Sequence, residues 1–229
     1  MFLHAERNSD YWLLWNAWQH SFRLPCDETY AGREVAIGLL GTRTRGKVGG
    51  RKTMLMTQML GTLRRPLYLL DTRRNGVGGQ SSWSPREFAS VIPDGLPRDL
   101  PYAFLHLPCL APSLELLAEK HMPWREFRRR YADELTAAAV GVACAFVEAA
   151  AAHGGLTVFL CSEADQPDFD ALPADQQDVH YCHRFTLARR VAAELKNAWL
   201  GVTVQLVHLD LYEFWQQRRT GYQPRREVI

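Results

Sequence analysis

The sequence lacks an apolar run long enough to span a bilayer, because the alanine-rich stretch near 137–152 is interrupted by Glu148. Its first residues, MFLHAERNSD, lack the charged-then-apolar order of a signal peptide. Five cysteines in 229 residues are an odd number and do not form the pattern of a disulfide framework. We therefore expect a cytoplasmic, reduced protein that does not enter a membrane.

The chain also lacks a large net charge, since +2 is too little to indicate nucleic-acid binding by itself. The charge is nevertheless unevenly distributed. An acidic loop at 163–178 contains no base, and a basic block at 43–52 contains no acid; the members of the basic block are Arg43, Arg45, Lys47, Arg51 and Lys52. Both are typical of solvated loops, and the basic block alternatively indicates a surface that faces the phosphates of a nucleic acid.

Apolar runs alternate with helical patterns along most of the chain. The predicted strands are 34–40, 66–70, 102–107, 156–160 and 202–207. This alternation predicts an α/β fold with three layers, α/β/α, and a largely parallel sheet of about five strands.

Three parts are expected: an aromatic N-terminal arm at 1–33, the α/β domain at 34–209, and a C-terminal helical tail at 210–229 that frays after Gly221. The arm contains a cluster of rings, namely Tyr11, Trp12, Trp15 and Trp18. These rings either pack onto the domain or form an interface with a partner protein.

The strongest functional signal lies between 156 and 191. Residues 156–160 form a continuous apolar run after a glycine pair, the pattern of a central strand buried on both faces. Farther along, an amphipathic helix begins. Open parallel sheets bind ligands where strands end and the following helices begin, so we expect the site there. The reactive side chains at these two positions are Cys161, Glu163, Cys182, His183 and Arg184.

These residue types indicate an anion-binding catalytic pocket. Arg184 offers a planar fork for phosphate or carboxylate beside the free N–H groups of a helix N-terminus. The same positive field favours the thiolate of Cys182 or Cys161. Glu163 is then a candidate general base and His183 a proton shuttle.

Asp71 and Arg73 follow another predicted strand, so we expect them to face this pocket as ligand-binding residues. A structural ion pair between Glu163 and Arg184 is the alternative interpretation of the same residues. It would stabilise the fold without any ligand.

Two other sites are disfavoured by the sequence. Gly41, Gly46 and Lys47 follow a strand at P-loop spacing, but Val48 stands where a nucleoside triphosphatase needs Ser or Thr for the metal. A metal site would combine Cys161, Cys182 and His183 with Cys109 or His180. Zinc sites normally show paired ligands on both sides, and one side here offers a single cysteine. We therefore assign no metal site, and the cofactor stays unknown.

Several short motifs together resemble the bacterial family called domain of unknown function 488. The residues that carry the resemblance are Asp71-Thr72-Arg73, Leu110-Ala111-Pro112-Ser113, Trp124 with Phe127 and Tyr131, Glu134-Leu135, Cys161-Ser162-Glu163, and Cys182-His183-Arg184. The resemblance covers roughly 34–209 and implies a compact α/β domain without implying a reaction. The chain departs from the family pattern in its acidic loop and its N-terminal arm, as a specialised branch would.

The resulting functional hypothesis is an intracellular enzyme, or an enzyme-like domain, that binds a phosphorylated or nucleotide-like ligand at the C-terminal edge of the sheet. The alternative is a non-catalytic module that binds nucleic acid or a protein. It would use the basic block and the arginines of a predicted helix, namely Arg125, Arg128, Arg129 and Arg130.

Overall fold

The computed structural model describes residues 2–4, 33–43, 52–74, 96–97, 100–119, 122–164, 182–217 and 221–229. Strands and helices alternate along most of these segments. In chain order the elements are β1 (Phe2–His4), β2 (Glu34–Arg43), α2 (Lys52–Thr62), β3 (Leu67–Asp71), β4 (Tyr102–His106), a 3-10 turn (Pro108–Leu110), α4 (Leu114–Ala118), α5 (Trp124–Glu134), α6 (Ala137–Ala152), β5 (Leu156–Ala164), α7 (His183–Ala198), β6 (Thr203–Leu209), α8 (Leu211–Gln217) and β7 (Arg225–Val228).

The strands form one seven-stranded sheet in the order β1-β4-β3-β5-β2-β6-β7. All neighbouring pairs are parallel except β6 and β7, which are antiparallel. The five predicted strands are all present, as β2 to β6, and Ile37, Leu69, Leu105 and Phe159 lie in the same sheet as expected. The sheet exceeds the expected five strands because a short strand is added at each edge.

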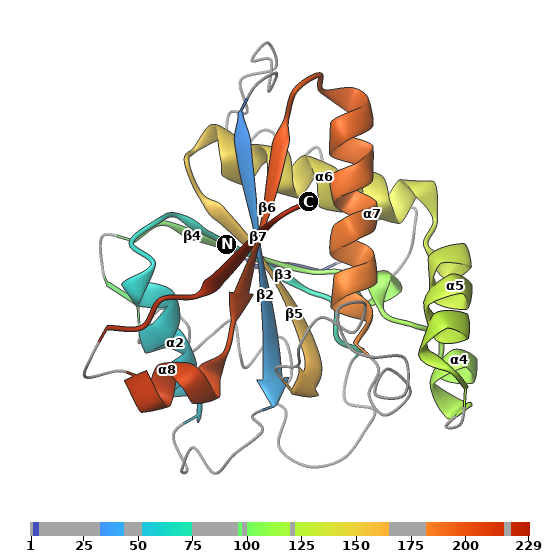
Figure 1. Cartoon of the computed structure of the whole chain (residues 1–229), viewed down its shortest axis with the longest axis horizontal. Helices are drawn as coiled ribbons and strands as arrows, with labels where there is room; N and C mark the ends of the chain where they lie inside the picture. Colours follow the sequence, from blue (N-terminus) through green and yellow to red (C-terminus); the bar gives the residue numbers. More distant parts are fainter. Residues whose placement is uncertain are drawn as a thin grey trace.

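Residue alternation along the strands divides the core into two apolar clusters, one on each face of the sheet. Tyr68 and Phe159 contribute to the cluster that contains α6 and α7, whereas Leu69 and Val158 contribute to the cluster that contains α2 and α8. Figure 1 shows α2 and α8 on one side of the strands and α6 and α7 on the other. The predicted three-layer α/β/α fold is therefore confirmed.

The turn before β5 sets where the central strand begins. Helix α6 ends at Ala152 with His153 as its C-cap, and Gly154 adopts a positive φ of 63°, the left-handed conformation that glycine tolerates best. At Gly155 a Cβ atom would lie 2.9 Å from the carbonyl oxygen of Pro66, so a larger residue would push the turn away from β3. The glycine pair thus brings β5 into register beside β3.

The C-terminal segment differs from the helical tail expected after Asp210. Helix α8 is present, but after Gly221 the chain forms β7 instead of fraying. The sequence RREV shows no strand pattern, and β7 forms because β6 offers an unpaired edge. The backbone N–H of Ile229 also donates to the carbonyl of Val204 at 3.0 Å.

Most of the N-terminal arm, the basic block apart from its ends in β2 and α2, and the acidic loop beyond Ala164 lie outside the described residues. Within the arm, β1 pairs in parallel with β4. Among the described residues, no single helix is both long and apolar enough to cross a membrane; α5 and α6 reach that length and apolar composition only together, as a pair that is bent by 90°.

Candidate functional site

The C-terminal ends of β2, β3 and β5 meet at one edge of the sheet. Asp71 pairs with Leu160 and Gly41 pairs with Cys161, so Asp71 and Cys161 lie at the same edge, as predicted. The connection after β2 leads toward β3, and the connection after β5 leads the opposite way, toward β6. Such a divergence is where open α/β sheets leave a crevice for ligands. In Figure 1 the arrowheads of β2 and β5 lie at the same end of the molecule as the first turn of α7.

Two cysteines and one arginine contact one another at this edge. Cys161 projects from β5 into the α6 and α7 face, and Cys182 is the N-cap of α7 with an extended backbone. Their Sγ atoms are 3.7 Å apart. Arg184 donates from Nη1 to the Sγ of Cys161 at 3.1 Å, and its guanidinium carbon lies 5.4 Å from the centre of the Phe185 ring. All three polar side chains are buried, which strengthens the electrostatic contact between guanidinium and sulfur.

A second contact joins β3 to the same helix through Thr72. The Thr72 hydroxyl donates to the carbonyl of Leu160 at 2.8 Å and lies 2.9 Å from Nε2 of His183. A carbonyl can only accept, and a hydroxyl has one proton to donate, so Nε2 of His183 must donate to Thr72. This network therefore holds the His183 proton on Nε2. The Tyr131 ring packs edge-on against the His183 ring at 5.5 Å and limits its rotation.

Asp71 and Arg73 form a buried ion pair with each other. Both carboxylate oxygens of Asp71 accept from Nε of Arg73, at 2.9 and 3.0 Å, and Nη2 of Arg73 donates at 2.6 Å. Nε2 of His106 lies 2.7 Å from the carbonyl oxygen of Arg73. By alternation Asp71 points to the same face as Leu69, the α2 and α8 side, whereas Cys161 points to the α6 and α7 side.

The structure thus brings together Cys161, Cys182 and Arg184, and places His183 beside them on α7. Asp71 and Arg73 share the edge of the sheet with this cluster, and their roles in ligand binding stay predictions. The backbone of Glu163 lies in β5, but its side chain is outside the described part of the chain. The ion pair between Glu163 and Arg184 stays a prediction for the same reason.

Thr72 is a residue of this edge that the sequence did not indicate. It stands between Asp71 and Arg73, and the alternation that turns Asp71 toward one face turns its neighbour toward the other, where His183 lies. The signal that could have found Thr72 is this alternation of side chains at the end of a predicted strand.

The other motif residues hold the layer that supports α7. Tyr131 donates from its hydroxyl to the carbonyl of Leu110 at 2.6 Å, and the Ser113 backbone N–H donates to the carboxylate of Glu134 at 2.8 Å. Ser113 also caps α4 by accepting from the backbone N–H of Leu116. These contacts tie α5 to the loop after β4. They show a structural role for the L-A-P-S segment and the aromatic helix.

In the described segments no group of three or more His, Cys, Asp or Glu side chains is arranged so that it could hold a metal ion. A hollow of about 840 Å³ lies at the opposite, N-terminal edge of the sheet. It is lined by the end of α2, including Thr62 and Arg64, and by Phe214 of α8. This hollow is separate from the cluster of cysteines.

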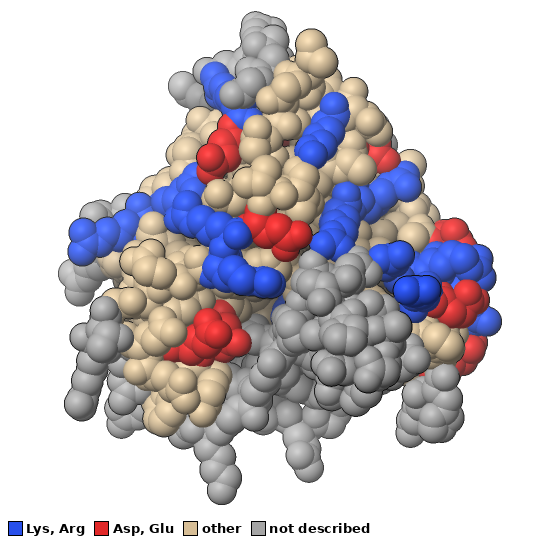
Figure 2. Space-filling model, viewed as in Figure 1, with Lys and Arg blue, Asp and Glu red and all other residues tan. Residues whose placement is uncertain are grey.

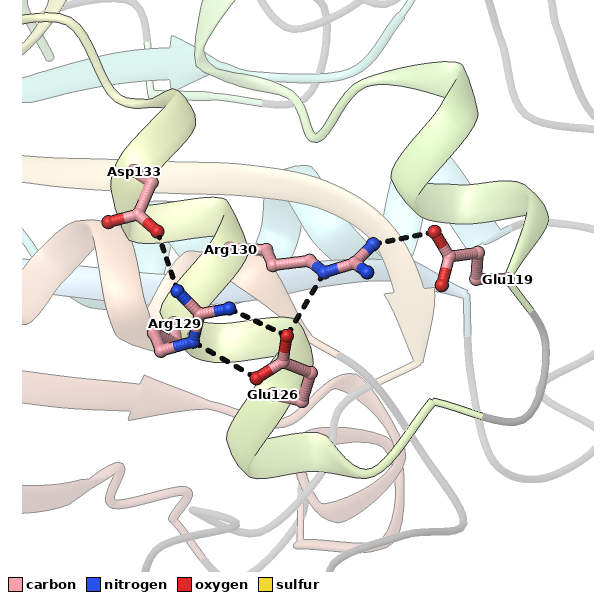
Figure 3. A network of polar contacts seen from close by, with 5 residues as sticks. All are labelled: Glu119, Glu126, Arg129, Arg130 and Asp133. Atoms are coloured by element: carbon pink, nitrogen blue, oxygen red, sulfur yellow. Dashed lines mark hydrogen bonds and ion pairs between the residues drawn. The ribbon is translucent and has the colours of Figure 1, made fainter.

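The arginines of α5 lie in a surface network of ion pairs. Arg129 contacts Glu126 at 2.7 Å and Asp133 at 3.2 Å, and Arg130 contacts Glu119 at 2.6 Å (Figure 3). On the face shown in Figure 2, Lys and Arg side chains form several separate groups with acidic side chains beside some of them. Two of the arginines expected to contact nucleic acid are therefore already paired with carboxylates.

The fold and the site define a mostly parallel α/β domain with a buried cluster of thiols, histidine and arginine at the C-terminal edge of its sheet. The family model described as domain of unknown function DUF488 matches residues 85–191 of the chain. The resemblance expected from the motifs is thereby confirmed. Asp71 to Arg73 precede the matched segment. A search of curated proteins and a search of solved structures return no match.

Proposed function

We propose that this protein is an intracellular enzyme, or an enzyme-like binding domain, that binds a phosphorylated or nucleotide-like anion at the C-terminal edge of its sheet. The proposal rests on one contact. The buried guanidinium of Arg184, in the first turn of α7, donates a hydrogen bond to the sulfur of Cys161 on β5. A buried cation beside a thiol, at a helix N-terminus, supplies both attraction for an anion and an activated nucleophile.

In this proposal Cys161 is the nucleophile. The guanidinium of Arg184 lies within hydrogen-bond distance of the Cys161 sulfur and favours its thiolate form. Phosphate or carboxylate groups of a ligand would bind the guanidinium of Arg184 and the backbone N–H groups of the first turn of α7.

His183 and Glu163 are assigned to proton transfer. Because Nε2 of His183 donates to Thr72, the proton to be transferred would arrive at Nδ1. Glu163 follows Cys161 by two residues on β5 and is the candidate general base. Arg73, held by Asp71 at the same edge, is the candidate second anion contact.

The alternative is a module that binds nucleic acid through its arginines. The ion pairs of Arg129 and Arg130 with carboxylates on the same surface speak against α5 as a phosphate-binding face. A salt titration separates the two functions, because several phosphate contacts make affinity fall steeply with ionic strength. A small-ligand site would saturate and would bind polynucleotide weakly.

The test begins with a thermal-shift screen of nucleotides and sugar phosphates on the wild-type protein. Arg184→Lys keeps the charge and loses the planar fork, so it should weaken the binding of a stabilising anion by roughly ten- to a hundredfold. Arg190→Lys is the matched control, because Arg190 lies on the same helix and forms a half-exposed ion pair with Glu194. It should leave the affinity unchanged.

Glu163→Gln addresses catalysis separately. If this carboxylate is a base, the variant should bind the anion like the wild type and lose turnover. Were Glu163 instead the structural partner of Arg184, both variants would melt at a lower temperature and neither would change binding selectively. An anion that stabilises the wild type and Arg184→Lys equally would contradict the proposed site.

A further inference from the structure

The Sγ atoms of Cys161 and Cys182 are in contact, although the two residues come from different elements. They are 3.7 Å apart, in side chains that are completely buried. Cys161 belongs to a strand at the centre of the sheet, and Cys182 precedes the first turn of α7. Neither is joined in a disulfide. A disulfide needs its sulfurs at about 2.05 Å, so the two sulfur atoms need to approach each other by less than about 2 Å.

Arg184 makes the two thiols unequal. Its Nη1 atom lies 3.1 Å from the sulfur of Cys161, and a cation at that position favours the thiolate, which is the reactive form of cysteine. Cys161 is therefore the sulfur that attacks first. Cys182 is in contact with Cys161 and can therefore react with an oxidised form of the Cys161 sulfur. Redox-sensing cysteines are often arranged in this way, with a second, resolving cysteine beside the first.

We propose that Cys161 and Cys182 are a redox couple that reduces a small hydroperoxide and becomes an intramolecular disulfide. The Cys161 thiolate attacks one peroxide oxygen, the O–O bond breaks, and the products are a sulfenic acid on Cys161 and a hydroxide ion that takes up the former thiol proton. The sulfur of Cys182 then attacks the sulfenic sulfur, the S–O bond breaks, and the hydroxyl group leaves with the Cys182 proton as water. For hydrogen peroxide the balance is two thiols and one peroxide giving one disulfide and two waters.

Burial decides which oxidants react. With both sulfurs fully buried, hydrogen peroxide, which is scarcely larger than water, should react faster than a bulky alkyl hydroperoxide. A low-molecular-weight dithiol regenerates the pair by thiol–disulfide exchange. The couple uses the residues of the proposed anion site but requires no anion.

The experiment uses the full chain, reduced with dithiothreitol, freed of reductant, and treated with one equivalent of hydrogen peroxide. Alkylation and peptide mass mapping should show two of the five thiols lost and the peptides of Cys161 and Cys182 joined, with a mass loss of two hydrogens. Cys182→Ser should stop at a sulfenic acid that a 1,3-dione traps on Cys161. Cys161→Ser should leave Cys182 reduced.

Two further variants test the mechanism. Arg184→Lys should slow the oxidation of Cys161 by about tenfold, because it weakens one charge-assisted hydrogen bond of ordinary strength. Cys144→Ser is the control: burial raises the pKa of the Cys144 thiol to about 12, so this cysteine stays protonated and its removal leaves the rate unchanged.

The peptide mass map of the oxidised wild-type protein tests the disulfide without any variant. A variant that fails to fold therefore does not prevent the test. A wild-type protein without the joined peptides would overturn the inference, as would an oxidation rate that Cys161→Ser does not change. Anion binding is measured on the same reduced sample. If the disulfide forms and no anion binds, the redox couple stands and the proposed ligand-binding function fails. If an anion binds and no disulfide forms, the ligand-binding function stands and the redox couple fails.

Discussion

Helix α5 and the C-terminal edge of the sheet both carry networks of charged side chains, in opposite surroundings. On α5, Arg129 and Asp133 expose 63% and 68% of their side chains. At the sheet edge, Arg73 and Asp71 expose 4% and 0%. The geometry of the contacts is similar, since each region contains an Arg–carboxylate contact of 2.6 or 2.7 Å.

The difference teaches that contact distance alone does not measure what an ion pair contributes. Water and salt screen the α5 network, and its members keep good solvation when a partner is lost. The buried network has no solvent to replace a partner. Substitutions that remove a charged partner should therefore lower the free energy of unfolding more at the buried sheet edge than on exposed α5.

The largest effect is expected for Asp71→Ala. It leaves the buried guanidinium of Arg73 without its carboxylate, which should destabilise the fold by about 3–5 kcal/mol. Urea unfolding measures the change. The double variant Asp71→Ala with Arg73→Met should recover much of the loss, because it removes the uncompensated charge. A loss in the free energy of unfolding below about 1 kcal/mol, which is the range for exposed ion pairs, would mean that the buried pair contributes no more than the pairs on α5.

A smaller effect is expected for Thr72→Val, which keeps the shape of the side chain and removes its hydroxyl. The buried Nε2–H of His183 then lacks its acceptor, at a cost of about 1–3 kcal/mol. Thr72→Ser keeps the hydroxyl and is the matched control. The two variants are compared by urea unfolding, and equal stability of both would mean that the contact with His183 contributes nothing.

Tyr131→Phe should cost about 1 kcal/mol, the ordinary net value of one hydrogen bond. It removes the bond to the carbonyl of Leu110 but keeps the ring that packs against His183. Thermal unfolding measures the loss of stability, and anion binding should be retained. Lost binding at unchanged stability would instead assign the Tyr131 hydroxyl to the site.

The smallest effect is expected for Glu126→Gln on exposed α5. The hydrogen bond from Arg129 lowers the pKa of Glu126 to about 2 from its usual 4.5. A lowered pKa means that any stabilisation is present above pH 4.5 and is lost as the pH falls from there toward 2. Because the group is exposed, the melting temperature at neutral pH should scarcely change. Carboxyl NMR titration should find the low pKa at low ionic strength and a shift back toward 4.5 in high salt.

The sequence determined the framework on which the site is built. A continuous apolar run after Gly154 and Gly155 is compatible with a central parallel strand, and β5 occupies that place. The alternation of strands and helices then predicted a largely parallel sheet, because a helix between two strands supplies the crossover connection that parallel pairing needs. These two features place Asp71 and Cys161 at the same edge of the sheet, because both residues follow or end parallel strands at their C-terminal ends.

Tertiary structure alone decided the contacts at that edge. The spacing from Cys161 to Cys182 carries no information about distance, and the 3.7 Å contact exists because β5 and α7 pack against each other. Thr72 is ordinary as a residue type, and its contact with His183 depends on which face of the sheet α7 covers. Strand β7, whose RREV sequence has no apolar pattern, exists because β6 presents an edge for backbone hydrogen bonds. Hydrophobic periodicity specifies elements and their burial, whereas pairings between distant polar groups depend on how those elements are brought together.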